Sequence, residues 1–191
     1  MVQNLDKYIK AGEIHRKVRE YIRPHLTEGI KYVDIVKIIE TKIAEEINKL
    51  NTFNGPPQLN HGIAFPTGIS VNNVAAHFTP HYTDDYVLKL DDVMKIDYGV
   101  HIDGCIIDSA FTINLNDKYS DILKASREAV NAIIKNIGVD SRFGDLSYIS
   151  TEIVESYERE DKPLKVIDNL AGHNIIPVSY THLTLPTTPY V

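Results

Sequence analysis

Apolar side chains recur at helical spacing in the first fifty residues. Between residues 5 and 23 four of them fall near one helix face, and Pro24 marks the end of the run: Ile9, Ile14, Val18 and Ile22. Residues 33 to 50 carry a second such stripe, made of Val33, Val36, Ile39, Ile43, Ile47 and Leu50. The pattern predicts two amphipathic helices. The segment 51–60 contains Gly55-Pro56-Pro57 and predicts a loop.

After residue 60 the pattern changes from helical to strand-like. Short β-rich runs cover residues 62–65 and 69–71, and a longer one covers 95–112. Helices are then expected over about 121–137, ended by Gly138 as a left-handed C′ glycine, and over about 142–157. A further strand is expected to begin at Val166-Ile167. Helices, then strands, then helices with antiparallel signals predict an α+β fold.

The long run contains two aspartates, Asp97 and Asp108, on either side of the hairpin turn signal Asp103-Gly104. Residues two apart in a strand share a face. A turn centred between Ile102 and Asp103 would place the two aspartates opposite each other. A turn centred on Asp103-Gly104 would place them diagonally, but still on one face.

Two carboxylates on one face of an apolar hairpin repel each other and lose hydration. A divalent metal, or a pair of metals bridged by a carboxylate, would resolve that conflict. A structural interpretation stays open, since one aspartate could belong to the turn or pair with a lysine.

Composition narrows the function classes only modestly. The 191 residues are 43% hydrophobic and 24% charged, as expected for one globular domain with a sizeable core. The net charge of −6 argues against a nucleic-acid or anionic-membrane surface. The basic run His15-Arg-Lys-Val-Arg19 is interleaved with Glu13 and Glu20 and is interpreted as a solvated helix face.

Cysteine usage and the N-terminus favour a cytoplasmic protein. The single cysteine, Cys105, excludes a disulfide framework and is expected to be a small core residue. No run approaches the length of a transmembrane helix, and the first residues show no signal-peptide pattern.

The last fifteen residues differ in character from the rest. Residues 177–191 contain no acidic, lysine or arginine side chain, whereas a quarter of the whole chain is charged. The string Val178-Ser-Tyr-Thr-His-Leu-Thr-Leu-Pro-Thr187 looks like the translation of a sequencing-library adapter. We therefore expect residues 1–176 to be a truncated catalytic domain and 177–191 to be non-native, so His182 is not counted as a ligand.

Two histidines stand in suggestive contexts. His77 follows the small residues Ala75 and Ala76, and His173 follows Gly172, so the backbone could approach a ligand closely at both positions. Taken alone, each is more readily explained as a satisfied core or surface histidine. The other histidines before the tail have no such context and are taken as structural or solvated: His15, His25, His61, His81 and His101.

Five motifs, in matching order and spacing, resemble type II methionine aminopeptidases over about residues 7–175. They are Gly62-Ile-Ala-Phe-Pro-Thr-Gly68, Ala75-Ala-His-Phe-Thr-Pro80, Lys95-Ile-Asp-Tyr-Gly-Val-His-Ile-Asp-Gly104, Ile107-Asp-Ser-Ala-Phe-Thr112 and Asn169-Leu-Ala-Gly-His173. The resemblance implies the pita-bread (creatinase/aminopeptidase-like) fold, of which this chain would hold the N-terminal half and the start of the second. It also implies removal of the initiator methionine from nascent polypeptides.

The resemblance implies roles for five residues. Asp97 would be a bidentate ligand of one metal, Asp108 would bridge two metals, and His173 would bind the second. His77 would contact substrate near the scissile peptide and stabilise the transition state, and Phe65 would line the methionine pocket. Two divalent ions of Mn, Fe, Co or Zn suit carboxylates with one imidazole.

The resemblance also implies two further glutamate ligands, and nothing after His173 is acidic. The fragment is therefore expected to be inactive.

The expected partners are nascent N-termini near the ribosome, and we expect a monomer that binds neither nucleic acid nor membrane. The alternative is a non-catalytic, partner- or RNA-binding homologue on the same fold, and the prolidase branch is a third possibility. The retained Asp97, Asp108, His77 and His173 favour the enzyme, and the Phe65-Pro-Thr-Gly68 and Ala75-Ala-His-Phe-Thr-Pro80 motifs argue against prolidase.

Overall fold

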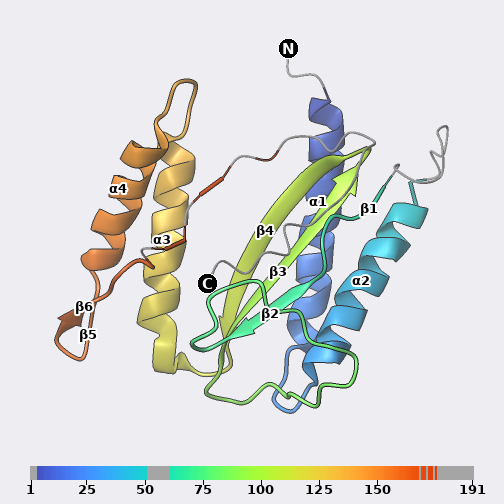
Figure 1. The fold of residues 1–191 in the computed structure, drawn as a ribbon, viewed down its shortest axis with the longest axis horizontal. Coiled ribbons are helices and arrows are strands. Elements are labelled where there is room, and N and C mark those ends of the chain that lie inside the picture. The colour runs from blue at the N-terminus through green and yellow to red at the C-terminus, as the bar shows by residue number, and fades with distance from the viewer. Residues whose placement is uncertain (1–3, 51–60, 168, 171, 174, 176–191) are drawn as a thin grey trace. The chain divides into compact units, whose positions relative to one another are not determined.

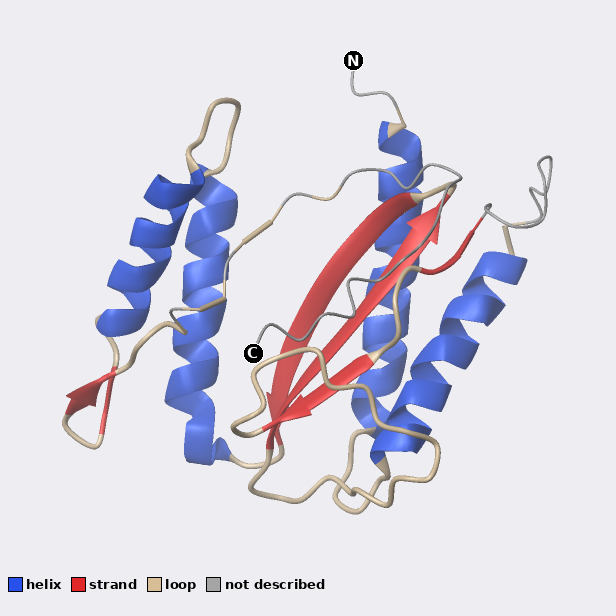
Figure 2. Ribbon diagram, viewed as in Figure 1, coloured by secondary structure: helices blue, strands red, loops and turns tan. Residues whose placement is uncertain are grey.

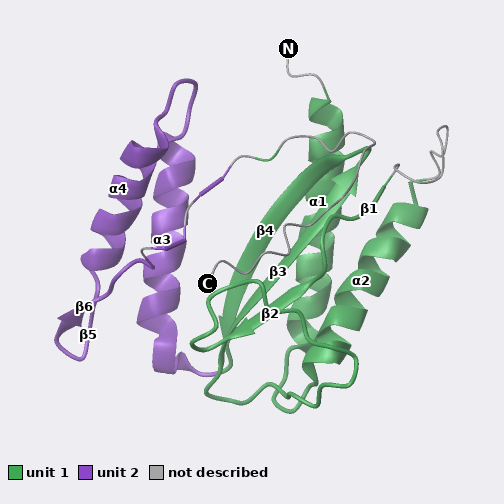
Figure 3. Ribbon diagram, in the orientation of Figure 1, with its two compact units in different colours: residues 1–115, 175–191 green, residues 116–174 purple. Residues whose placement is uncertain are grey.

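The computed structural model describes residues 4–50, 61–167, 169–170, 172–173 and 175 (Figure 1). The chain divides into two compact units (Figure 3): residues 1–115 with 175–191, and residues 116–174. The expected loop at 51–60 and the tail at 177–191 lie outside the described residues, so the expected boundary at residue 177 stays a prediction. None of the helices in the described ranges has the length and apolar content that a bilayer crossing requires.

The first unit begins with two helices close to the predicted ones, α1 (Leu5–Ile22) and α2 (Tyr32–Asn48). A 3-10 turn containing Pro24 follows α1 (Arg23–His25). The buried stripe of α1 differs from the predicted one, because Ile9 is exposed and Ala11 is buried. Ala11, Ile14, Val18 and Ile22 are three to four residues apart, whereas Ile9 lies five residues before Ile14 and falls outside that stripe. In α2 the stripe consists of Tyr32, Ile35, Ile39, Ile43 and Ile47.

A four-stranded antiparallel sheet packs against these helices (Figures 1 and 2). Its central strand β3 (Val93–Ile102) pairs along one edge with β4 (Cys105–Asn114). Along the other edge it pairs with two short strands, β2 (Gly68–Val71) near its start and β1 (His61–Ile63) near its end. Two strands of the sheet are therefore long and continuous, and both belong to the hairpin that carries the aspartates.

One face of this sheet forms the hydrophobic core with α1 and α2. The even-numbered residues of β3 are buried there, as strand alternation requires: Met94, Ile96, Tyr98, Val100 and Ile102. Cys105 is also buried, so its expected place in the core is confirmed. The odd-numbered residues of β3, including Asp97, point to the opposite face.

The basic run of α1 is not a solvated face throughout, and of the two possibilities left open for His15, structural or solvated, the structure shows the structural one. His15 is 4% exposed, its ring stacks on Tyr98 at 4.1 Å, and its Nε2 lies 3.0 Å from the Tyr98 carbonyl oxygen. Arg16 and Lys17 are exposed as predicted, and Arg16 pairs with Glu20 at 2.8 Å. The charged neighbours of His15 suggest a solvated position, but His15 lies beside the buried stripe of α1 and not on its outer face.

Burial predicts a pH dependence of stability. Loss of hydration lowers the pKa of His15, and it also lowers the pKa of His61 and of His101. Each group therefore binds a proton more readily in the unfolded chain, where the pKa is about 6.5. The contribution of these histidines to the free energy of unfolding is complete above that pH, and it is lost as the pH falls below it. We expect the free energy of urea unfolding to decline between about pH 6.5 and 5, and His15→Gln to reduce the slope. A slope unchanged by this variant would contradict the assignment to His15.

The second unit holds α3 (Ser120–Asn136), α4 (Phe143–Glu155) and a short hairpin, β5 (Glu158–Arg159) and β6 (Lys162–Pro163). A 3-10 turn, Asp117–Tyr119, precedes α3. Within the unit, Arg159 holds the start of α3 through its ion pair with Asp121 at 2.9 Å. Both helices agree with the predicted ranges to within two residues.

Two predictions in this unit are wrong. Gly138 is not among the described glycines with positive φ, because Ile137 leaves the helix in an extended conformation and Asn136 Nδ2 already donates to the Ala132 carbonyl at 2.8 Å. Gly138 N–H instead donates to Ser141 Oγ at 2.8 Å. The strand expected from Val166-Ile167 is absent from described residues 164–167, where no neighbouring described strand offers a ladder partner.

Candidate active site

The hairpin of β3 and β4 carries both aspartates on one face. Asp103 and Gly104 form a two-residue turn with φ of 48° and 77°. A type I′ turn, whose twist matches that of the flanking strands, requires positive φ at both residues. Asp97 therefore lies opposite Ala110, and Asp108 lies opposite Gly99. This is the diagonal arrangement, the second of the two predicted registers. The shared face is confirmed.

This face, opposite the helix-covered core, is accessible in the first unit. Asp97 is half-buried and Asp108 is exposed. On the β2 side, Gly68 lies opposite Asp97, and a Cβ at Gly68 would come within 3.5 Å of the Asp97 Cβ. The backbone of β2 at Gly68 therefore packs directly beside the Asp97 side chain.

Phe65 lies on the same face, directly over Gly99. A Cβ added at Gly99 would lie 2.3 Å from Phe65 Cε1 and 2.8 Å from the Ala64 Cβ. The Ala64 N–H also donates to the Gly99 carbonyl at 2.9 Å, which fixes the approach of the two segments. The aromatic ring predicted to line a pocket is thus next to both aspartate positions, because Gly99 lies two residues after Asp97 in β3 and opposes Asp108 in β4.

Gly99→Ala tests this close approach. Overpacking should lower the free energy of unfolding by about 1–3 kcal/mol, because the added Cβ would overlap both the Phe65 ring and the Ala64 Cβ. Gly12→Ala in α1 is the matched control, since nothing lies within 4 Å of its added Cβ. Alanine there should stabilise by about 0.5–1 kcal/mol. Chemical denaturation of both variants checks the pair, and equal stabilities would contradict the packing argument.

His77 lies in a left-handed conformation, with φ of 63°. Such a conformation costs a non-glycine residue about 1–2 kcal/mol, so surrounding contacts must hold it. The next residue, Phe78, supplies them: its carbonyl accepts from Ile69 N–H at 2.6 Å, and its N–H donates to Ser70 Oγ at 3.3 Å. The segment carrying His77 is therefore bonded to β2, the strand that carries Gly68, and the His77 side chain is exposed.

His173, the remaining candidate ligand, lies in the second unit and is exposed. Its convergence with the aspartates stays a prediction. Within the described ranges, no group of three or more His, Cys, Asp or Glu side chains is placed to hold a metal ion. The structure thus brings together Asp97, Asp108 and Phe65, with the His77 segment alongside on β2.

Two further residues share the aspartate face and were not predicted as site residues. Lys95 and His101 are odd-numbered residues of β3, and their side chains therefore point to the same face as that of Asp97. Burial lowers the pKa of Lys95, and its Nζ donates to the Asn72 carbonyl at 2.8 Å. His101 Nδ1 accepts from Gly104 N–H at 3.3 Å at the hairpin turn. The two-residue alternation that placed the aspartates would have found both.

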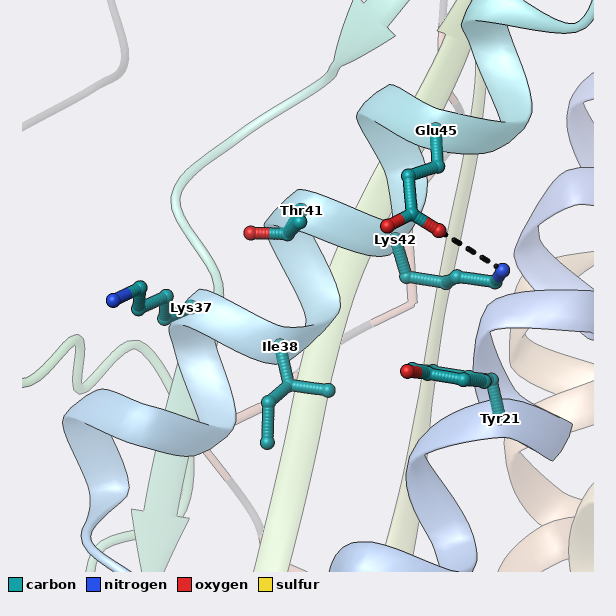
Figure 4. A pocket seen from close by; sticks show the side chains of 6 residues that line it. All are labelled: Tyr21, Lys37, Ile38, Thr41, Lys42 and Glu45. Atoms are coloured by element: carbon teal, nitrogen blue, oxygen red, sulfur yellow. Dashed lines mark hydrogen bonds and ion pairs between the residues drawn. The ribbon is translucent and has the colours of Figure 1, made fainter.

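A small hollow of about 190 Å³ lies elsewhere, on the outer side of α1 and α2 (Figure 4). It is lined by Tyr21, Lys37, Ile38, Thr41, Lys42 and Glu45. Lys42 is already paired with Glu45 at 3.1 Å and lies over the Tyr21 ring at 4.6 Å. This hollow is remote from the aspartate face and offers no reactive pair, so we do not assign the active site to it.

The sequence profile of Metallopeptidase family M24 matches residues 6–182. The chain belongs to this family. Among curated relatives, methionine aminopeptidase 2 of Debaryomyces hansenii is 44% identical over 170 residues, which are 87% of this chain and 39% of that protein. Methionine aminopeptidase 2A of Arabidopsis thaliana is 46% identical over 170 residues, 87% of this chain and 37% of that protein. The resemblance to type II methionine aminopeptidases is confirmed, and the M24 chain spans less than two-fifths of these relatives' length.

Solved structures show the same fold. A methionine aminopeptidase from Thermotoga maritima gives a TM-score of 0.63 at 23% identity, covering 82% of the M24 chain and 62% of that chain. The prolidase of Pyrococcus furiosus gives 0.63 at 19% identity, covering 82% and 43%. At these identities the likeness concerns the fold alone. The expected α+β pita-bread fold is confirmed, and this chain holds only part of it.

Membership of a metallopeptidase family implies divalent metal ions as cofactors. The donors on the M24 hairpin fit such ions. Asp97 and Asp108 offer hard carboxylate oxygens on one face of the hairpin, and such oxygens suit divalent ions. The hairpin thus supplies part of a donor set.

Proposed function

We propose that the protein is a methionyl aminopeptidase that removes the initiator methionine from nascent polypeptides. The observation that carries the proposal is the shared face of Asp97 and Asp108, found in an M24 chain that is 44% identical to a protein named methionine aminopeptidase 2. Because the chain covers 39% of that relative, the activity is proposed for a protein that also has the remaining C-terminal portion.

In this proposal Asp97 and Asp108 hold two divalent ions of Mn, Fe, Co or Zn, and His173 is a further ligand by resemblance. When bound, such ions lower the pKa of a coordinated water and polarise the scissile carbonyl. Phe65 forms one wall of the pocket for the methionine side chain, which its position over Gly99 supports. His77 contacts the substrate near the scissile peptide, and the bonds of Phe78 to β2 support a fixed position for it.

The proposal places the reaction in the cytoplasm, on the N-termini of new chains near the ribosome, and treats the protein as a monomer. A net charge of −6 supports a substrate other than nucleic acid. A single buried cysteine supports a reducing compartment. The non-catalytic alternative has no observation in its favour, since the candidate residues of the M24 site are retained.

The test uses a protein that joins residues 1–176 to the C-terminal portion that the curated relatives carry. After metal removal and reloading with Co²⁺ or Mn²⁺, this protein should release methionine from a Met-Gly-X peptide. It should leave an Xaa-Pro dipeptide intact. Cleavage of the dipeptide alone would indicate the prolidase branch. RNA binding without any peptide hydrolysis would support the non-catalytic alternative.

A further inference from the structure

Helix α1 reaches the backbone of both hairpin strands directly behind the aspartates. His15 Nε2 lies 3.0 Å from the Tyr98 carbonyl oxygen and 3.1 Å from the Ser109 carbonyl oxygen. Tyr98 and Ser109 lie opposite each other in the β3–β4 ladder. Tyr98 is the residue after Asp97, and Ser109 is the residue after Asp108. One imidazole therefore bridges the two strands at the two positions that follow the proposed ligands.

The bonding pattern fixes the tautomer of this histidine. Both partners of Nε2 are carbonyl oxygens, which only accept, so Nε2 must carry the hydrogen and donate to both. The Tyr98 hydroxyl donates back to the His15 carbonyl at 2.9 Å, and the two rings are stacked with 7° between their planes. His15 is thus held by three contacts to the strand that carries Asp97 and one to the strand that carries Asp108.

Arg19, one turn further along α1, extends the same attachment on β4. Its Nη2 donates to the Ala110 carbonyl at 3.0 Å and to Ser109 Oγ at 3.3 Å. Ala110 is the residue opposite Asp97. We call His15 and Arg19 the α1 clamp. Every one of its polar contacts falls on residues 98, 109 and 110, which flank the two aspartates.

We infer that the α1 clamp positions Asp97 and Asp108 for metal binding by fixing the backbones of β3 and β4 relative to each other from the core side. The inference rests on the proposed metal-dependent function and names His15 and Arg19 as positioning residues. Neither touches the metal-binding face, because their partners are strand carbonyls and the Ser109 hydroxyl, which lies with the Tyr98 side chain on the core face. Outer residues that orient ligands typically change metal affinity on the order of 10–100-fold.

The test compares His15→Phe and His15→Gln in the longer protein described above. Phenylalanine keeps a ring against Tyr98 but cannot donate, whereas the glutamine amide can donate to both carbonyls. The metal-free proteins are titrated with Co²⁺ and followed by visible absorption, which reports affinity and coordination geometry. We expect His15→Phe to weaken Co²⁺ binding on the order of 10–100-fold and to alter the spectrum. His15→Gln should stay within about threefold of the unaltered protein and restore the spectrum.

A second measurement requires no metal. In the metal-free protein, amide hydrogen exchange should accelerate in His15→Phe at the β3–β4 pairs around residues 97–110. Ile35→Val, a fully buried change in α2, is the control for general loss of stability. It should leave both the Co²⁺ spectrum and the local exchange pattern unchanged. Should His15→Phe fail to fold, Arg19→Met keeps an aliphatic stem at a partly exposed position and should still weaken Co²⁺ binding several-fold.

The outcomes separate this inference from the proposed function. Co²⁺ affinity and spectrum that are unchanged in His15→Phe, or in Arg19→Met where His15→Phe does not fold, overturn the clamp. An equal loss in Ile35→Val also overturns it. If the unaltered protein binds Co²⁺ through Asp97 and Asp108 but releases no methionine, the proposed function is wrong, and the His15→Phe titration still decides the clamp. If it binds no Co²⁺ at all, both are wrong.

Discussion

Asp97→Asn and Asp108→Asn are each expected to weaken divalent metal binding more than ~100-fold in the longer protein and to abolish methionine release. Each variant removes one of the two carboxylates that share the hairpin face. A direct ligand should matter more than the outer residues whose loss typically costs 10–100-fold. Metal titration of the metal-free protein and hydrolysis of a Met-Gly-X peptide check the prediction.

Misfolding must be separated from ligand loss in these variants. Asp103→Asn is the matched control, because Asp103 lies at the turn of the same hairpin and pairs with Lys7 at 3.2 Å in a solvent-accessible setting. It should cost at most about 1 kcal/mol and retain metal binding. Without metal, the Asp97 and Asp108 variants should melt no lower than the unaltered protein, since they relieve carboxylate repulsion. Retained metal affinity in either variant would remove these residues from the site.

His77→Ala is expected to lower kcat on the order of 10²–10³-fold while changing metal affinity little. That is the usual cost of losing one group that stabilises the transition state without binding a metal. The left-handed conformation of His77 and the bonds of Phe78 to β2 fix the backbone that carries the imidazole. Steady-state hydrolysis of Met-Gly-X, together with Co²⁺ titration, separates the two effects.

His81→Ala is the control for this variant. His81 is an exposed histidine on the same segment, and its Nδ1 lies 2.7 Å from Thr83 Oγ1 within the loop. Its loss should leave kcat within about twofold if His77 alone carries the role. Normal turnover by His77→Ala would refute the role, and loss of metal in that variant would instead make His77 a ligand.

The part of this site that is local in sequence could be predicted. The turn residues Asp103-Gly104 and two-residue alternation were sufficient to place Asp97 and Asp108 on one face. The sequence left the exact register open, because two turn centres satisfied the same alternation. The two left-handed φ values at the turn select one of them.

Contacts between distant segments could not be predicted. The approach of Phe65 to Gly99 depends on β1 pairing with the end of β3, and no short-range pattern encodes that pairing. The sequence leaves His15 either structural or solvated, because its neighbours Arg16 and Lys17 are charged and its burial depends on where the sheet lies. The expected strand at Val166-Ile167 is wrong for the same reason: β propensity gives no ladder without a partner.

The contact between Gly99 and Phe65 also constrains how this site can diverge. Every other amino acid at position 99 adds at least the Cβ that would lie 2.3 Å from the Phe65 ring. The Ala64 Cβ would lie 2.8 Å from the same added atom, so a smaller side chain at position 65 does not by itself make room at position 99. A side chain there also requires the backbone of residues 64–65 to move away from β3. Among homologues we therefore expect positions 64, 65 and 99 to change together, and a glycine at position 99 to accompany a close approach of this segment to the hairpin.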